Sequence, residues 1–253
     1  MANRSELLIP VYQSCFPDVL CLQEAGPYYR AGSSAMLAWL GEHYTEICYA
    51  AEGGSGNPVF YDPQVLEAVE SGYVKSRNGD KGTTWAVFRQ ISTGSLFTVT
   101  NSHFAADTNA GGNAGLGNTY RVQDAEAAVR AGEAILQKYG EIPVFSGGDF
   151  NCMTGSDPYQ AFLNAGYENV RDLAQESDSR SPYHGSFAYD AGFGIYPLQT
   201  SLPYRAELAI DHIMATGKAA EIACYRVLSD ALALTGSDHA PHLIDIDLGE
   251  RSD

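Results

Sequence analysis

Short apolar runs separated by turn-forming residues dominate the chain. The runs with β-type composition lie at residues 19–23, 59–61, 65–67, 73–75, 83–89, 96–100, 142–145, 208–210, 225–228 and 243–248. The last run alternates between apolar and polar residues, which predicts a strand with one buried face. Short strands parted by turn residues at this rhythm predict a meandering sheet.

Three stretches have helical periodicity instead. Residues 4–15 place apolar side chains on one face, although Pro10 should limit or bend this helix, and residues 33–44 predict a second helix. Residues 119–139 have the strongest pattern. The polar residues of this third helix that are predicted to face solvent are Arg121, Asp124, Glu126 and Arg130. Helices that recur between strands predict a layered α/β arrangement, not an all-β sandwich.

Length and composition favour one soluble domain. A chain of 253 residues without a composition break is predicted to fold as a single domain over residues 1–253. Five cysteines have no zinc-type spacing and are predicted to be reduced thiols. No apolar run approaches the roughly 18 residues that span a bilayer. We expect a soluble monomer, located in the cytoplasm or secreted if an upstream signal peptide has been removed.

Five short polar motifs punctuate the apolar runs. They are residues 22–24 (LQE), 101–103 (NSH), 148–151 (GDFN), 210–213 (IDHI) and 237–239 (SDH). Four of them follow or end a predicted strand, where open sheets commonly build their sites. Carboxylates, an amide and histidines at one place suit a hard metal ion and an acid–base histidine. The motifs therefore predict a metal-dependent phosphoesterase.

Each motif also has a structural reading. Glu24 could be a solvent-exposed carboxylate at a strand end, and His103 a strand-end polar residue. Asp149 and Asn151 could form a turn after a buried strand, whereas an extended backbone would point both side chains to one face. His239 could be a capped core histidine. The occurrence of all five motifs in one chain favours a shared site.

The motifs and their order resemble the endonuclease/exonuclease/phosphatase superfamily of DNase I-like proteins. The segments that carry the resemblance are residues 17–24 (PDVLCLQE), 57–63 (NPVFYDP), 100–104 (TNSHF), 120–125 (YRVQDA), 148–151 (GDFN) and 237–241 (SDHAP). The segments at 148–151 and 237–241 are the most specific, and the match covers nearly the whole chain. The resemblance implies a four-layered α/β/β/α sandwich of two mainly antiparallel sheets flanked by helices.

The resemblance also implies a role for each polar residue near the metal and the water. Glu24 and Asp238 would bind the metal, Mg²⁺ or Mn²⁺. Asp149 would position the attacking water and help to deprotonate it. Asn151 would donate a hydrogen bond to the phosphoryl oxygens as charge builds up on them.

The histidines divide into two groups. The resemblance implies that Asp211 pairs with His239, which would touch the scissile phosphate, and that His103 is a second donor near it. His184, in residues 183–187 (YHGSF), resembles a segment at the rim of the site. The two histidines expected to be structural, because strand geometry points them away from their neighbours in the site, are His212 and His242.

One family feature has no match in the sequence. Family members usually begin with a strand whose Asn helps to hold the metal, just before the helix that here starts near Arg4. Asn3 lies at the helix start with no apolar strand before it. We therefore expect an N-terminally truncated form that lacks one central strand and binds metal less well.

The sequence thus predicts hydrolysis of phosphomonoesters or phosphodiesters by in-line attack of water. The expected substrate is a phosphorylated small molecule or nucleotide, because a net charge of −16 disfavours extended duplex DNA. A nuclease acting on single-stranded or duplex nucleic acid is one alternative. Its support is a possible basic strip formed by Lys75, Arg77, Lys81 and Arg89. A catalytically inactive binding protein that retains the fold is a second alternative.

Overall fold

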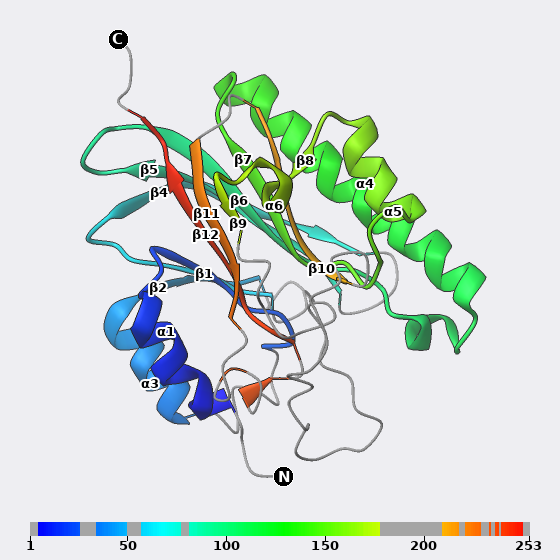
Figure 1. Ribbon diagram of the computed structural model, residues 1–253, viewed down its shortest axis with the longest axis horizontal. Helices are drawn as coiled ribbons and strands as arrows, with labels where there is room; N and C mark the ends of the chain where they lie inside the picture. The colour runs from blue at the N-terminus through cyan, green and yellow to red at the C-terminus, as the bar shows by residue number, and fades with distance from the viewer. Residues whose placement is uncertain are drawn as a thin grey trace.

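The computed structural model describes residues 5–25, 34–49, 57–76, 81–177, 209–217, 221–228, 233, 236–237 and 239–249 (Figure 1). Its largest element is a six-stranded sheet. In sheet order the strands are β4 (Leu66–Lys75), β5 (Gly82–Gln90), β6 (Leu96–His103), β7 (Val144–Asp149), β10 (Asp211–Thr216) and β8 (Glu168–Asn169). Strands β6 and β7 are parallel, and the other pairs are antiparallel. The parallel pair brings the ends of two motif-bearing strands to one edge.

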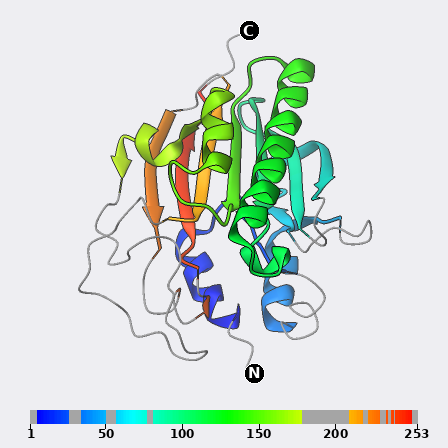
Figure 2. The same cartoon turned by 90° about the vertical axis from the view of Figure 1, so that its right-hand side faces the viewer.

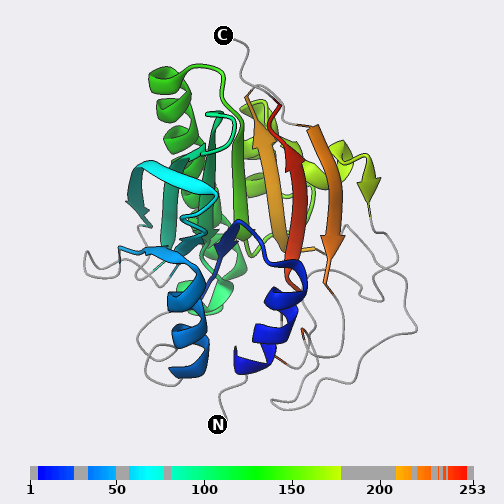
Figure 3. The ribbon, with the colours of Figure 1, turned by 90° about the vertical axis from the view of Figure 1, so that its left-hand side faces the viewer.

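Two three-stranded sheets lie over one face of this sheet (Figures 1 and 3). The first contains β1 (Val19–Cys21), β3 (Val59–Tyr61) and β2 (Thr45–Ile47), and the second contains β12 (His242–Asp247), β11 (Glu221–Val227) and β9 (Glu176–Ser177). Apolar side chains from all three sheets, including Phe88, Phe145 and Tyr225, form a shared core. Burial of these apolar side chains is the main force that holds the two layers of sheet together.

Helices cover both outer faces. Helices α4 (Ala114–Tyr139) and α5 (Asp157–Asn164) lie against the six-stranded sheet (Figure 2). The β1–β3–β2 sheet is covered by the 3₁₀ helix η1 (Ser5–Leu8), α1 (Ile9–Cys15) and α3 (Ser34–His43). Two further short elements are η3 (Asp107–Ala110) and α6 (Val170–Leu173). The predicted α/β/β/α layering is confirmed.

A stack of three aromatic side chains packs beneath the site. Phe104 follows β6, Phe150 follows β7 and Phe162 belongs to α5, and all three are fully buried. The rings of Phe104 and Phe150 stack with centroids 4.5 Å apart, and those of Phe150 and Phe162 with centroids 5.0 Å apart. This stack fixes the backbone on either side of the motif at the end of β7.

The long helix departs from its prediction in two ways. It begins at Ala114, five residues before the predicted start at 119, because the Asn113 side chain accepts a hydrogen bond from the Leu116 N–H and caps the first turn. The prediction that Arg121 and Asp124 face solvent was wrong, since both are buried. Glu126 and Arg130 do lie on the exposed face, with Arg130 Nη1 3.6 Å from Glu126 Oε2.

Contacts outside the helix explain the buried charges. Arg121 donates to the Ala105 carbonyl and pairs with Asp107 at 2.7 Å. Asp124 accepts from the Ser76 hydroxyl at 2.6 Å and from the Ala105 N–H at 3.1 Å. Paired and hydrogen-bonded charges can be buried without the cost of an isolated ion. These two residues anchor the segment that follows His103.

Two other elements differ from their sequence patterns. The runs at 65–67 and 73–75 are parts of one strand, β4, which is kinked by a bulge between Ala68 and Glu70. Pro10 is the second residue of α1 and does not break the helix, because proline is tolerated in the first turn. Among the described residues, no helix is long and apolar enough to cross a membrane.

Candidate active site

Three predicted residues share one row across the six-stranded sheet. His103 on β6 lies opposite Asp149 on β7, and Asp211 on β10 lies opposite the same Asp149. The register of three neighbouring strands therefore collects residues that are up to 108 positions apart in sequence (211 − 103). Their side chains meet at the end of the sheet where β6 and β7 finish and β10 begins.

Asp149 lies between two imidazoles. Its Oδ2 atom is 3.3 Å from His103 Nε2 and 4.0 Å from His239 Nε2. His239 turns its other ring nitrogen, Nδ1, toward Asp211, at 2.8 and 3.0 Å from the two carboxylate oxygens. The predicted contact between Asp211 and His239 is thus present. His239 is the most exposed of these four side chains, with 29% of its surface exposed against 4% for His103.

Asn151 reaches the same group through a turn. Its φ of 49° excludes the extended backbone that would have placed it beside Asp149, so that prediction was wrong. The Asn151 N–H instead donates to Asp149 Oδ1 at 2.8 Å, and its Nδ2 donates to Asp149 Oδ2 at 3.2 Å. A further hydrogen bond from Nδ2 to the Phe104 carbonyl fixes the amide. Asn151 therefore lies in a turn and still belongs to the same site as Asp149.

Gly148 is required by the close approach of β6 and β7. Its φ is 135°, and a Cβ atom there would lie 1.9 Å from the Ser102 carbonyl oxygen. No side chain fits that space, so this position accepts glycine alone. The close approach aligns His103 with Asp149.

A buried amide ties this row to the second layer. Asn101 Nδ2 donates to the carbonyls of Leu22 and Pro58, both at 2.9 Å, and its Oδ1 accepts from Gln23 Nε2 at 2.7 Å. These bonds fix the chain just before Glu24. The sequence motif at 101–103 drew attention to His103 alone, although a buried amide inside an apolar strand was a signal for Asn101 as well.

The structure describes only one of the two predicted metal-binding residues. Glu24 is exposed, has a φ of 58° and lines the same groove as Asp211 and His239. Asp238 and His184 lie outside the described residues. One candidate ligand set is assembled nonetheless, since an oxygen or nitrogen from each of Asp149, Asp211 and His239 lies within 4.8 Å of the others. Two carboxylates and an imidazole are a donor set that fits a divalent cation.

Lys81 adds a cation that the resemblance does not assign to the site. Its Nζ contacts the His103 ring, at 3.2 Å from Nδ1 and closer to Nε2. The proposed basic strip is not continuous: Arg89 lies at the other end of β5 and pairs with Glu67 at 2.8 Å. Arg77 lies outside the described residues.

The two histidines expected to be structural point elsewhere. His212 Nε2 contacts the Cys152 carbonyl at 2.8 Å, and burial lowers the pKa of His212. His242 Nδ1 contacts the Tyr225 hydroxyl at 3.1 Å, and burial lowers the pKa of His242 to about 4. Both rings are therefore neutral at pH 7. All five cysteines are free thiols, as predicted.

Solved structures with the same fold have diverse descriptions. The mannosyl-6-phosphatase of Bacteroides thetaiotaomicron is 20% identical, with a TM-score of 0.67 over 96% of this chain and 90% of its own. The human Nocturnin catalytic domain with a bound sulfate anion is 19% identical, with a TM-score of 0.60 over 96% and 87%. A truncated Caenorhabditis elegans TDP2 is 13% identical, with a TM-score of 0.65 over 97% and 91%. At these identities the likeness establishes the fold.

Comparison with curated protein sequences gives no match. The model of the endonuclease/exonuclease/phosphatase family matches residues 1–239, which include the described motif residues from Glu24 to His239. With that match over most of its length, the DNase I-like fold and the cluster of Asp149, Asp211 and two histidines, the chain belongs to the endonuclease/exonuclease/phosphatase family.

Proposed function

We propose that the chain hydrolyses phosphate esters with a divalent metal, Mg²⁺ or Mn²⁺, by in-line attack of water. The observation that carries this proposal is the position of Asp149 between His103 and His239, with Asp211 behind the second imidazole. That arrangement supplies a carboxylate for a water and two imidazoles for phosphoryl oxygens in one cluster. One domain holds the whole cluster and works as a monomer.

Each side chain has a separate task in the proposed reaction. Asp149 accepts the proton of the attacking water, and Asn151, held by its bond to the Phe104 carbonyl, donates to a phosphoryl oxygen. His239 faces the phosphate from its exposed side while Asp211 fixes the orientation of the ring. His103 approaches from the buried side.

The metal belongs beside this row. Glu24 and Asp238 are the residues we propose to hold it, and the oxygens of Asp149 and Asp211 are close enough to contribute. When bound, a divalent ion neutralises charge that develops on the phosphoryl oxygens. Lys81 places a further positive charge beside His103, and we assign it to the binding of the anionic substrate.

A phosphorylated small molecule is the proposed substrate class. The net charge of −16 and the separation of Lys81 from Arg89 leave no broad basic surface in the described part of the chain. The neighbour described as a mannosyl-6-phosphatase acts on a substrate of this kind. Single-stranded nucleic acid is the second candidate, since Lys75 lies opposite Gly82, the neighbour of Lys81, beside the site.

Ester hydrolysis with defined chromogenic substrates tests the proposal. We expect Mg²⁺- or Mn²⁺-dependent release of p-nitrophenol from p-nitrophenyl phosphate or its bis ester, with loss of at least ~100-fold in Asp149→Asn. Asp172→Asn is the matched control, because Asp172 is exposed and pairs only with its neighbour Arg171 among the contacts described. Turnover that survives in Asp149→Asn would refute the assignment of this residue.

Two further measurements separate the alternatives. Binding of single-stranded and duplex oligonucleotides across a salt series tests the nuclease, and no binding at low salt excludes it. Titration with Mn²⁺ measures metal binding without turnover. Metal binding with no hydrolysis of any ester would favour the inactive binding protein.

A further inference from the structure

Hydrogen bonds from several elements fix the backbone at Lys81. Its carbonyl oxygen accepts from the Ser76 N–H at 3.0 Å and from the Tyr73 hydroxyl at 3.1 Å. The carbonyl of the next residue, Gly82, accepts from Asn57 Nδ2 at 2.9 Å, and Asn57 is fully buried. These partners belong to β4, to the residue that follows it and to the segment that leads into β3. Both sheet layers therefore set the position of Lys81 at the start of β5.

A buried carboxylate reinforces this position from the helical layer. Asp124 of α4 accepts from the Ser76 hydroxyl at 2.6 Å and from the Ala105 N–H at 3.1 Å. It thus joins the residue after β4 to the segment that follows His103. Burial raises the pKa of Asp124, whereas these two hydrogen bonds and the positive charges of Lys81 and His103 act in the opposite direction. Asp124 is therefore a counter-charge for both groups.

Lys81 and His103 bring two groups that can carry positive charge into contact. Lys81 Nζ lies 3.2 Å from His103 Nδ1, and His103 Nε2 lies 3.3 Å from Asp149 Oδ2. Positive charges so close repel each other, and an anion with two charges relieves that repulsion better than an anion with one. Lys81 is half-buried and His103 is almost fully buried. The space beside them therefore suits a bare phosphoryl oxygen better than an oxygen that carries a second organic group.

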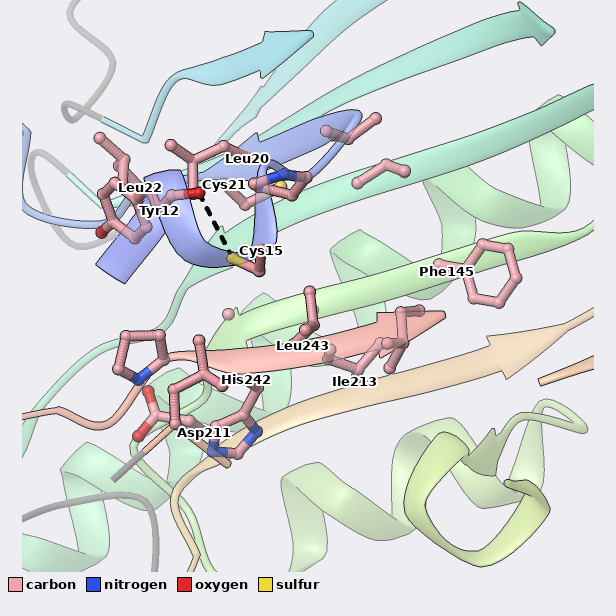
Figure 4. A pocket seen from close by; sticks show the side chains of 18 of the residues that line it. Tyr12, Cys15, Leu20, Cys21, Leu22, Phe145, Asp211, Ile213, His242 and Leu243 are labelled. Carbon is pink, nitrogen blue, oxygen red and sulfur yellow. Dashed lines mark hydrogen bonds between the residues drawn. The ribbon is translucent and has the colours of Figure 1, made fainter. Parts of the chain in front are cut away.

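The other end of the row has the opposite charge. Lys81 directly precedes β5, beside His103 on β6, whereas Asp211 begins β10. A groove of about 750 Å³ beside Asp211 is lined by many apolar side chains, of which Figure 4 shows Cys21 and Leu243. The charged side chains other than histidine that line this groove are Asp18, Glu24, Asp211, Asp245 and Arg226. Carboxylates thus dominate at the Asp211 end, and the protein supplies its own positive charge at the Lys81 end.

We propose that Lys81 is a specificity-determining residue of this site, and that it selects phosphate monoesters, as dianions, over phosphate diesters. The inference rests on the proposed function, since it concerns the ester that the same cluster hydrolyses. A monoester has three terminal oxygens and, above its second pKa of roughly 6, two charges, whereas a diester has two terminal oxygens and one charge. The third terminal oxygen faces Lys81 and His103. Ser76 and Asp124 are positioning residues, because they act through the backbone that presents Lys81.

Two substrates that differ by one methyl group and one charge test this proposal. The monoester preference is the ratio of kcat/KM for p-nitrophenyl phosphate to kcat/KM for methyl p-nitrophenyl phosphate, at about pH 8 and saturating Mg²⁺. Lys81→Met removes the charge and keeps the length of the side chain, and we expect it to lower this ratio at least ~30-fold. Lys81→Arg should retain most of the preference. Lys138→Met is the matched control, since Lys138 lies at the far end of α4 and pairs with Glu70.

A binding measurement makes the test independent of turnover. Phenylphosphonate is a dianion, and methyl(phenyl)phosphinate is a monoanion of the same size in which a methyl group replaces one oxygen. Neither has an ester bond to hydrolyse. With Mg²⁺ present, calorimetry should show at least ~10-fold tighter binding of the phosphonate, and Lys81→Met should abolish most of that difference. Ser76→Ala, which removes the link to Asp124, should give an intermediate preference.

The outcomes separate this inference from the proposed function. If the chain hydrolyses esters and Lys81→Met slows both substrates by the same factor, the specificity role is overturned and the proposed function stands. If the chain hydrolyses neither ester, the proposed function fails, and the phosphonate and phosphinate affinities still decide the role of Lys81. Equal binding of these two ligands by the unmodified chain would overturn the inference, as would a monoester preference that survives in Lys81→Met.

Discussion

Replacing Asp211 with Asn tests whether this carboxylate acts through His239. The pair is partly shielded from water, with 12% of the Asp211 side chain and 29% of the His239 side chain exposed, and the shortest contact is 2.8 Å. A charge-assisted hydrogen bond of this kind contributes about 2 to 4 kcal/mol at the effective dielectric of such a site. If the contribution is made in the transition state, Asp211→Asn lowers kcat/KM by roughly 30- to 1,000-fold.

A double-mutant cycle separates positioning from metal binding. His239→Ala should cost more than Asp211→Asn, on the order of 1,000-fold, because it removes the group that faces the phosphate. If Asp211 acts through the imidazole, the double variant should be no slower than His239→Ala alone. The assay is kcat/KM for a p-nitrophenyl ester at saturating metal, with Asp172→Asn as the control for loss of a surface carboxylate.

The opposite pattern would refute the reasoning. If the two losses multiply, Asp211 contributes independently of His239. Weaker Mn²⁺ binding in Asp211→Asn would then identify it as a metal ligand, in line with the close approach of Asp149, Asp211 and His239.

Three further perturbations test other parts of the structure. Phe162→Ala should lower the free energy of unfolding by about 3 to 5 kcal/mol, measured by urea denaturation, because Phe162 is fully buried in the aromatic stack. Leu163→Ala, at a 38% exposed neighbour, should change it little. Asn101→Ala should cost about 2 to 4 kcal/mol and weaken Mn²⁺ binding, since it removes three hydrogen bonds that the buried Asn101 makes to the second layer. The control Asn118→Ala removes an exposed bond to Asp157 and should do neither. Stability should fall as pH drops from 6.5 to about 4, because the unfolded state protonates His242 first; His242→Asn should flatten that part of the profile in pH-dependent thermal melts.

The convergence of the motifs was predictable, but their register was not. Apolar runs and the polar groups after them are local features, so the positions of His103 and Asp149 near the ends of strands could be predicted from the sequence. The row formed by His103, Asp149 and Asp211 depends on which strands pair and in what register, which is set by long-range contacts. The resemblance to the family, and not the local pattern, predicts the contact between Asp211 and His239.

Buried polar residues were the main source of error. Helical periodicity placed Arg121 and Asp124 on the solvent side, and only their contacts with residues 105–107 and Ser76 explain their burial. Asn101 is buried for the same reason, because its hydrogen-bond partners lie beside a different sheet. A residue's polarity predicts exposure only where no distant partner satisfies it.

Hydrolysis in ¹⁸O-labelled water tests the proposed chemistry most directly. With Mg²⁺ or Mn²⁺ present, attack of water on phosphorus must place one labelled oxygen in the phosphate product and none in the alcohol, as read by mass spectrometry or ³¹P NMR. Asp149→Asn should form this product at least ~100-fold more slowly. Label in the alcohol, or an equal rate of labelled phosphate formation in Asp149→Asn, would contradict the account.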